Sequence, residues 1–315
     1  MSVEESYTSA GGSIPVKMFL NTKCYNMLKK GELLPVSISI NLTNKCNLNC
    51  SFCSCADRDK TEELSTIDIV NFIKSNSSIQ SVILTGGGEP LLYKDLEYLI
   101  SFLYRKKIKI GIVTNGLLID KYSKDIFNKV DWIRISLSDE SDKVFDFFKK
   151  NIYKKNINGL GFSYVCGNNL EKNIKIVLSF YNEFENIFTH FRIINDIYIL
   201  DNRVNDLKLK MLSKDKEYKK IIFQDRKNYV NGERECYISC LKPNINASGD
   251  ITPCCGIQYV KDYLIKKDTF LMGNIKDKSI LWIPFKGDIC DKCYYDYYNK
   301  IIKSFISEIK DLEFI

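Results

Sequence analysis

The stretch VSISINLTNKCNLNCSFC, residues 36–53, decides how the rest of the chain is interpreted. Its first half alternates apolar and small polar residues, which is the period-two pattern of a β-strand. Directly after this predicted strand, Cys46, Cys50 and Cys53 follow with the spacing C-x3-C-x2-C. Three thiolates in one loop can converge, and soft thiolate ligands favour an iron–sulfur cluster, zinc or copper. The stretch therefore predicts a metal-binding loop at the end of a strand.

The cellular compartment decides whether such cysteines bind metal or form disulfides. The chain has 315 residues, with 12 cysteines and one histidine. Its N-terminal sequence lacks the basic region of a secretory signal, and no apolar run approaches the roughly 20 residues that cross a bilayer. We therefore expect a cytoplasmic protein without membrane contact, in which disulfides are rare.

The charge pattern bears on the partners of the protein. The net charge of +7 comes from 46 basic and 39 acidic residues. Many lysines alternate with acidic residues, as on solvated helix faces, so nucleic acid is not an expected partner. An acidic peptide or a phosphate-bearing substrate stays compatible with the net charge.

Strand-like and helix-like patterns alternate from residue 36 to about residue 200. The predicted strands, some with their turns, are 36–43, 81–85, 109–116, 132–138, 159–165 and 190–196. The predicted helices are 65–75, 95–107, 122–130, 141–151 and 170–184. Six strands alternating with five helices indicate parallel βα units, and their apolar runs look buried on both faces. An open doubly wound sheet and a partial (β/α) barrel both fit this pattern.

After about residue 200 the pattern changes, which divides the chain into segments. A charged stretch comes first, and a turn-rich stretch with six more cysteines follows it. The predicted segments are an N-terminal extension (1–35), the βα region (36–200), a connecting segment (201–230) and a cysteine-rich C-terminal domain with a terminal helix (231–315).

Four motifs in the βα region resemble those of the radical S-adenosylmethionine (radical SAM) enzymes. CNLNCSFC is similar to the family signature, which has an aromatic residue before its last cysteine. TGGGEP after the second strand resembles the G-G-E-P turn of the family, and TNG and ISLS end the third and fourth strands. The resemblance selects a partial (β/α)6 TIM-like barrel. The cofactor-binding residues that it implies are Phe52, Gly87, Gly88, Glu89, Asn115 and Ser136.

The resemblance also implies a reaction. Cys46, Cys50 and Cys53 would bind a [4Fe–4S] cluster whose fourth iron binds S-adenosylmethionine. One electron, from an external donor such as flavodoxin or ferredoxin, would cleave S-adenosylmethionine to methionine and a 5′-deoxyadenosyl radical, which abstracts hydrogen from a substrate. The G-G-E-P turn would receive the amino group of S-adenosylmethionine, and Ser136 would meet its ribose.

The C-terminal cysteines form a second group. A C-x2-C step such as ICDKC suits two ligands of one metal. The spacing of the first cysteines in this group resembles the auxiliary-cluster domains called SPASM and twitch, which implies one auxiliary [4Fe–4S] cluster. The implied ligands are Cys236, Cys254, Cys290 and Cys293, with Cys240 and Cys255 as alternates. A four-cysteine zinc site fits the same spacing.

Several functions remain open at this point. Relatives with such C-terminal domains suggest a peptide or protein side chain as the first candidate substrate. The alternative is a small molecule such as a sugar, a nucleoside or an antibiotic precursor. A non-catalytic protein with two zinc sites that binds nucleic acid is a third possibility. A thiol–disulfide redox protein that uses Cys290 and Cys293 would leave the three-cysteine loop unexplained.

Overall fold

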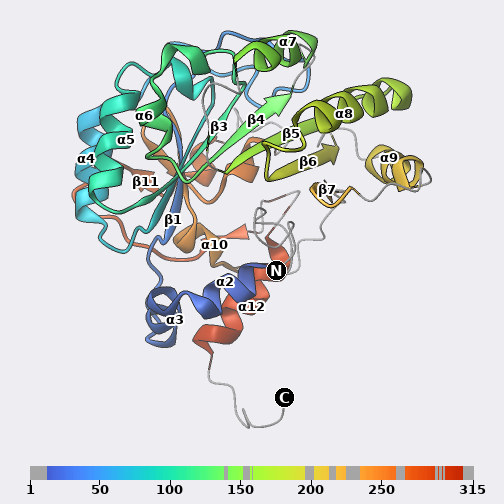
Figure 1. The fold of residues 1–315 in the computed structure, drawn as a ribbon. Helices are drawn as coiled ribbons and strands as arrows, with labels where there is room; N and C mark the ends of the chain where they lie inside the picture. The colour runs from blue at the N-terminus through green and yellow to red at the C-terminus, as the bar shows by residue number, and fades with distance from the viewer. Residues whose placement is uncertain are drawn as a thin grey trace.

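Parallel strands in the order of the chain form the sheet that dominates this computed structural model (Figure 1). The structure describes residues 13–137, 141–151, 157, 159–195, 202–212, 218–224, 235–259, 267–287, 290, 293 and 295–307. The parallel strands are β1 (Ser37–Asn41), β2 (Ser81–Thr85), β3 (Lys109–Thr114), β4 (Trp132–Leu137), β5 (Leu160–Cys166), β6 (His190–Asn195) and β7 (Ile221–Gln224). The strands predicted from the sequence are confirmed.

Helices connect the strands and pack on the outer face of the sheet (Figure 1). They are α4 (Thr66–Ser75), η1 (Pro90–Leu92), α5 (Leu96–Arg105), η2 (Ile119–Lys121), α6 (Lys124–Phe127), α7 (Ser141–Asn151), α8 (Leu170–Phe184) and α9 (Arg203–Leu212). This βα alternation with a parallel sheet confirms the partial barrel. No helix in the described part of the chain is both long and apolar enough to cross a membrane.

Side-chain caps define where two of these helices begin. The hydroxyl of Ser65 accepts a hydrogen bond from the backbone N–H of Asp68 at 3.5 Å, at the start of α4. The side chain of Asn169 accepts from the backbone N–H of Lys172 at 3.0 Å, at the start of α8. Each cap satisfies one of the N–H groups that a helix leaves unpaired at its first turn.

The two faces of the strands have different surroundings. In β4, Ile133, Ile135 and Leu137 are buried on the face that meets the helices. The residues between them, among them Arg134 and Ser136, face a cavity on the inner side of the sheet. The sequence suggested strands buried on both faces, but the structure shows an inner face with polar and charged side chains.

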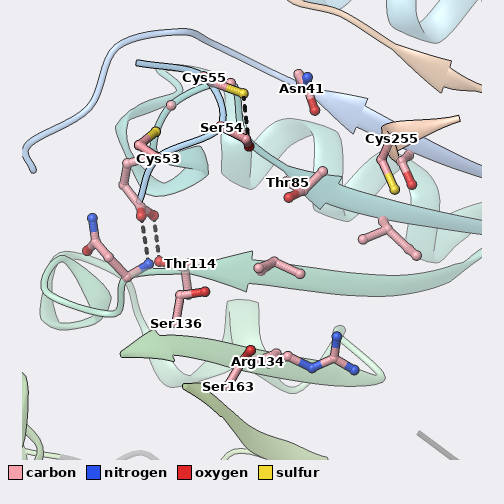
Figure 2. A pocket seen from close by; sticks show the side chains of 18 of the residues that line it. Asn41, Cys53, Ser54, Cys55, Thr85, Thr114, Arg134, Ser136, Ser163 and Cys255 are labelled. Carbon is pink, nitrogen blue, oxygen red and sulfur yellow. Dashed lines mark hydrogen bonds between the residues drawn. The ribbon is translucent and has the colours of Figure 1, made fainter. Parts of the chain in front are cut away.

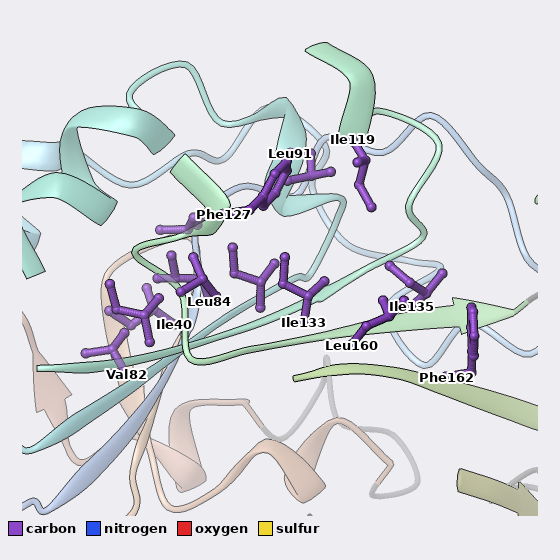
Figure 3. Close-up of a cluster of buried hydrophobic side chains, with 14 of the residues drawn as sticks. Ile40, Val82, Leu84, Leu91, Ile119, Phe127, Ile133, Ile135, Leu160 and Phe162 are labelled. Carbon is purple, nitrogen blue, oxygen red and sulfur yellow. The ribbon is translucent and has the colours of Figure 1, made fainter. Parts of the chain in front are cut away.

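The main core lies between the sheet and its helices (Figure 3). Ile40, Val82, Leu84 and Ile133 come from neighbouring strands and meet side chains from the outer elements. Phe162 on β5 is 0% exposed. Its ring centroid lies 5.4–6.0 Å from those of Phe148, Phe180, Phe184, Phe188 and Phe191. Such ring pairs add about 0.5–1.5 kcal/mol each beyond their burial, so this cluster anchors the β4–β6 half of the barrel.

The first part of the cysteine-rich segment continues the barrel sheet. It supplies β9 (Asn244–Ile245), β10 (Asp250–Thr252) and β11 (Gly273–Asn274). β9 pairs in parallel with β1, and β9 to β11 form antiparallel pairs. Gly249, with φ +93°, makes the turn between β9 and β10 that the sequence indicated. The two predicted domains therefore share one sheet, so the expected boundary near residue 231 is not a physical separation.

The predicted connecting segment, 201–230, also differs from expectation. It contains α9 and β7, and β7 pairs in parallel with β6. A seventh βα unit therefore extends the sheet beyond the six that the sequence indicated. Charged side chains on α9 and the shortness of β7 hid this unit from the pattern.

A smaller core joins the two ends of the chain. Its helices are α2 (Ser13–Leu20), α3 (Thr22–Lys29), α10 (Ile238–Leu241) and α12 (Asp296–Ile306). A short antiparallel pair, β8 (Glu235–Cys236) and β12 (Phe285–Lys286), lies in the same C-terminal region, together with the turns η4 (Cys255–Tyr259) and η5 (Lys267–Phe270). The described part of the predicted N-terminal extension, from residue 13 on, thus packs on the C-terminal segment (Figure 1).

We expect Phe162→Ala to lower the free energy of unfolding by about 3–5 kcal/mol, because it leaves a cavity inside the ring cluster. Tyr104→Ala is the matched control, since this ring is 55% exposed, and it should change stability by less than about 0.5 kcal/mol. Denaturant unfolding followed by circular dichroism measures both. Equal effects of the two substitutions would show that the ring cluster does not anchor the barrel.

Candidate functional site

A cavity of about 400 Å³ lies on the inner face of the sheet. Its walls come from β1 to β7, from the cysteine loop (residues 46–58), from the glycine turn (residues 86–89) and from residues 255–256. Cys53 and Cys55 lie at the end where the strands finish, and Arg134 is set further back along β4 (Figure 2). Sites of α/β enzymes are built at this end, because the loops that follow parallel strands meet there.

The three cysteines of the signature lie on one wall of this cavity. Cys46, Cys50 and Cys53 are each half-buried, and all three line the cavity. The backbone N–H of Cys53 donates to the carbonyl of Cys50 at 3.1 Å, and that of Leu48 donates to Sγ of Cys46 at 3.5 Å. Phe52, the aromatic residue of the signature, lines the same cavity. The structure therefore brings together the residues that the signature predicted.

Arg58 holds the cysteine loop in place, a role that the sequence analysis missed. Its Nε donates to the carbonyl of Asn44 at 2.9 Å. Its Nη1 donates to Sγ of Cys53 at 3.4 Å and to the carbonyl of Cys55. Arg58 thus ties the signature cysteine Cys53 to the backbone on both sides of the loop. No motif marks this arginine, because its partners are set by how the loop folds.

The glycine turn packs directly against the segment that precedes the cysteine loop. The N–H of Gly88 donates to the carbonyl of Thr43, and that of Glu89 donates to the carbonyl of Lys45, both at 2.8 Å. A Cβ on Gly88 would lie 2.0 Å from the carbonyl oxygen of Lys45, and one on Gly87 would meet a side-chain oxygen at 1.8 Å. Only glycine allows two backbones to approach this closely.

Glu89 joins the glycine turn to the end of the neighbouring strand. The side chain is 2% exposed. One carboxylate oxygen accepts from the N–H of Leu91 at 3.0 Å and from the hydroxyl of Thr114, and the other accepts from the N–H of Asn115 at 2.8 Å. Burial raises the pKa of Glu89, and these three hydrogen bonds oppose that rise. Most of the hydrogen bonds that this carboxylate can accept are therefore made within the protein.

Asn115 and Ser136 complete the predicted set around the cavity. The amide nitrogen of Asn115 donates to the side-chain oxygen of Asn47 in the cysteine loop at 2.7 Å. Its oxygen accepts from the N–H of Leu117 at 3.1 Å. Ser136 lies at the end of β4 and lines the cavity (Figure 2). The loops after β1, β2 and β3 are therefore connected to one another by side-chain and backbone hydrogen bonds.

The C-terminal cysteines gather around Cys254. Cys236 and Cys293 pack with Cys254 against the smaller core, and Cys290 packs with it against a cluster of two other buried residues. Burial raises the pKa of Cys254 well above its usual value, and nearby Cys255, Cys236 and Cys290 raise it further. The four predicted auxiliary ligands thus come from three segments to one region.

The two alternates differ from these four. Cys240 is 0% exposed and belongs to the protein interior, where burial raises its pKa to about 12. Cys255 is exposed and lines the main cavity, although it also lies close enough to Cys254 to raise the pKa of that thiol (Figure 2). Cys240 therefore belongs to the interior, whereas Cys255 lies between the main cavity and Cys254.

The donor chemistry of both cysteine groups fits an iron–sulfur cluster. Within the described ranges, no three His, Cys, Asp or Glu side chains are placed to hold a single metal ion. The usual protein ligands of an iron–sulfur cluster are cysteine thiolates. The three signature thiols on the cavity wall and the four C-terminal thiols, Cys254 and the three around it, are of this kind.

Three more cations of the cavity were missed by the sequence analysis. Arg134, Arg192 and Lys242 all line it. A signal did exist for the two arginines, because in WIRISLS and HFRIIND they occupy alternate positions that share the inward face of their strands. Lys242 precedes β9 and comes to the cavity only because β9 pairs with β1.

We expect Glu89→Gln to lower the free energy of unfolding of the protein without its cofactors by about 1–3 kcal/mol. The new amide NH2 group would face a donor whose hydrogen bond the carboxylate now accepts, so that buried donor would lose its partner. Thermal unfolding followed by circular dichroism measures the change. Asp146→Asn, on the exposed side of α7, makes the same chemical change and should have little effect. Equal unfolding midpoints for the two variants would show that this carboxylate does not hold the loops together.

Comparison with known proteins places these features in a family. Residues 40–163 match the family model described as the Radical SAM superfamily. A GTP 3′,8-cyclase of Helicobacter pylori (strain HPAG1) is 26% identical over 299 residues, covering 81% of this chain and 92% of that protein. Another GTP 3′,8-cyclase, from Helicobacter pylori (strain ATCC 700392 / 26695), is 30% identical over 152 residues, which cover 45% of this chain and 47% of that protein.

Solved structures show the same fold. SuiB of Streptococcus suis bound to S-adenosylmethionine has a TM-score of 0.57 at 18% identity, and the match covers 94% of this chain and 81% of SuiB. SuiB bound to the precursor peptide SuiA has a TM-score of 0.56 at 18% identity, with coverage of 97% and 74%. Enzymes of the matched family use a [4Fe–4S] cluster and S-adenosylmethionine. These comparisons support a radical SAM enzyme: residues 40–163 form its radical SAM domain, and a cysteine-rich C-terminal segment follows the barrel.

Proposed function

We propose that this enzyme binds its [4Fe–4S] cluster through Cys46, Cys50 and Cys53 and abstracts hydrogen from a small molecule held in the barrel cavity. The observation that supports this proposal is that the three thiols, the glycine turn and Asn115 all line one cavity. Three protein ligands leave one iron of such a cluster for S-adenosylmethionine. The residues of the cavity then have separate parts in binding, orientation and shielding.

Cys46, Cys50 and Cys53 would hold the cluster, which, with an electron from an external donor such as flavodoxin or ferredoxin, would supply the reductive cleavage of S-adenosylmethionine to methionine and a 5′-deoxyadenosyl radical. The protein positions the groups around it. Gly87 and Gly88 keep side chains away from the cysteine loop, so that backbone carbonyls can receive the ammonium of the cosubstrate. Glu89 fixes the turn from behind, and Ser136 offers a hydroxyl at the end of β4.

Apolar side chains on the inner face limit side reactions. Ile83, Val113, Val165 and Ile194 line the cavity between its polar residues. Such surroundings keep water from the reacting atoms, and the position in which the substrate is held directs the radical to its target. The alternation of apolar and polar residues along each strand thus serves both shielding and binding.

The C-terminal cysteines are proposed to hold an auxiliary cluster. Cys236, Cys254, Cys290 and Cys293 are the ligands, since Cys240 is buried in the interior and Cys255 faces the main cavity. Four cysteine ligands would leave no iron open, so the auxiliary cluster would relay electrons. A zinc site with the same four ligands is the alternative, and metal analysis separates the two.

A small molecule is the better-supported substrate class. The relative from Helicobacter pylori (strain HPAG1), which this chain covers almost throughout, is named for a reaction of GTP. A cavity of about 400 Å³ falls in the range of about 300–1,000 Å³ that is typical for small-molecule sites. A nucleoside compound was among the small molecules expected from the sequence.

A peptide or protein side chain, the first expectation from the sequence, stays the second candidate. The likeness that favours it is the fold of SuiB, which was solved with its precursor peptide SuiA and matches 97% of this chain. In this structure, the N-terminal helices pack beside the C-terminal segment. The likeness concerns the fold, so the proposal places the small molecule first.

We expect the anaerobically reconstituted protein to contain about eight iron atoms, as two clusters require, and to form 5′-deoxyadenosine when it is reduced with S-adenosylmethionine. Cys50→Ala should lose about half of the iron and all of this product, whereas Cys254→Ala should lose the other half and keep part of the product. Cys24→Ala is the control, because Cys24 is buried in α3 outside both groups. Iron analysis and chromatography of the products provide the measurements.

Two outcomes would contradict the proposal. Full iron content in Cys50→Ala would show that Cys50 is not a ligand of the cluster at the cavity. Zinc in place of iron at both sites, with no 5′-deoxyadenosine, would favour the non-catalytic alternative.

A further inference from the structure

Arg134 is held in a fixed position on the inner face of the barrel. Its guanidinium carbon lies 5.1 Å from the ring centroid of Trp132. Its Nε donates to Nε2 of His190 at 3.3 Å. The guanidinium therefore has an aromatic face beside it and a hydrogen-bond acceptor at its base, while the residue lines the cavity (Figure 2). Such contacts fix an arginine before any ligand binds.

His190 is suited to this role because it is neutral. It is 1% exposed, and burial together with the charges of Arg134 and Arg192 lowers its pKa to about 3. The hydroxyl of Thr189 donates to the carbonyl of Leu160, so it accepts from Nδ1–H of the imidazole at 3.0 Å. Nε2 of the imidazole is then free of hydrogen and can accept from the arginine.

Two glycines on the neighbouring strands make room for this arrangement. Gly161 on β5 lies between Arg134 and His190 in the sheet register, and a Cβ on it would come within 2.1 Å of the imidazole. Gly111 on β3 lies opposite Trp132, and a Cβ there would come within 2.2 Å of the indole. Glycine weakens a strand interior, so its presence at both positions indicates that the close approach of the two rings matters.

Two further cations face the same part of the cavity. Nη2 of Arg192 on β6 donates to the hydroxyl of Ser163 on β5 at 3.2 Å. Lys242 lines the cavity next to these arginines. Three basic side chains therefore share one cavity.

Basic side chains outnumber acidic ones among the described residues that line the cavity. Among the described residues that line it, Glu89 is the only carboxylate, and its oxygens accept hydrogen bonds from the ends of β2 and β3. Like charges gathered in a partly buried space lower stability, because water screens them poorly there. A site of this composition becomes favourable when an anion enters it.

We propose that Arg134, Arg192 and Lys242 form a subsite for the phosphate groups of a phosphorylated small-molecule substrate. The guanidinium forks match phosphate oxygens two at a time, and the ammonium adds a point charge. The subsite lies further back in the barrel than the cysteine loop, so a bound substrate reaches from its phosphates toward the mouth. This proposal rests on the proposed function, in that the cavity is the substrate site of the enzyme.

Trp132 and His190 are positioning residues in this proposal, since they act through Arg134. Gly161 and Gly111 act one step further away, by leaving room for the two rings. A substitution at Gly161 thus disturbs the subsite while all three positive charges remain in the protein. A loss of binding in such a variant would therefore show that the placement of Arg134 matters, and not only the number of positive charges.

The test measures binding of inorganic tripolyphosphate to the anaerobically reconstituted full-length protein by isothermal titration calorimetry. Citrate, which carries carboxylates in place of phosphates, is the comparison ligand. We expect tripolyphosphate to bind, and Arg134→Gln and Arg192→Gln to weaken its binding by about 10- to 100-fold each. Lys149→Gln, which removes an exposed lysine on α7, is the control for net charge and should leave binding unchanged.

Gly161→Ala should weaken tripolyphosphate binding by about 10-fold while the iron content stays that of the parent. It also covers the case in which an arginine variant does not fold, which circular dichroism would show. Binding that is unaffected in both Arg134→Gln and Gly161→Ala would overturn the proposal. Citrate binding as tight as that of tripolyphosphate would overturn the assignment to phosphate.

The binding measurement is independent of the radical reaction, because it needs neither S-adenosylmethionine nor a reductant. A protein that binds tripolyphosphate through these residues but forms no 5′-deoxyadenosine would support the subsite and contradict the proposed function. A protein that forms 5′-deoxyadenosine but does not bind tripolyphosphate would contradict the subsite alone.

Discussion

The buried carboxylate of Glu89 is the interaction on which the mouth of the barrel depends. It accepts hydrogen bonds from Leu91, Thr114 and Asn115, and so joins the ends of β2 and β3. The N–H of Glu89 in turn donates to the carbonyl of Lys45, just before the cysteine loop. A buried charge is tolerated only when it is well hydrogen-bonded, so the same contacts that keep Glu89 in place also hold three loops in register.

The barrel accommodates a reaction because only one face of its sheet is packed. Aromatic and aliphatic side chains fill the space between the strands and the outer helices, with Phe162 at the centre of one ring cluster. The inner face carries serines, arginines and cysteines around a cavity. Stability thus comes from the outer layer, and the inner layer is left free for groups that cost stability, such as the neighbouring charges of Arg134 and Arg192.

Much of the fold followed from local patterns, and the differences have physical causes. Period-two and helical patterns located the strands β1 to β6 and the helices between them, since local burial determines both patterns. β7 was missed because four residues after a charged helix carry too weak a pattern. The continuation of the sheet through β9 to β11 was missed because pairing between β1 and β9 joins residues about 200 positions apart, such as Ser39 and Asn244.

The sequence by itself determined the chemistry of this protein: the cysteine spacing and the glycine turn have few other uses, and they stand at the ends of predictable strands. Tertiary structure decided the surroundings of that chemistry. Arg58 reaches the cysteine loop, Lys242 reaches the cavity, and His190 faces Arg134 across Gly161 only after distant segments have paired. The reason is that a spacing motif lies within one loop, whereas a binding surface is assembled from side chains whose directions depend on strand register.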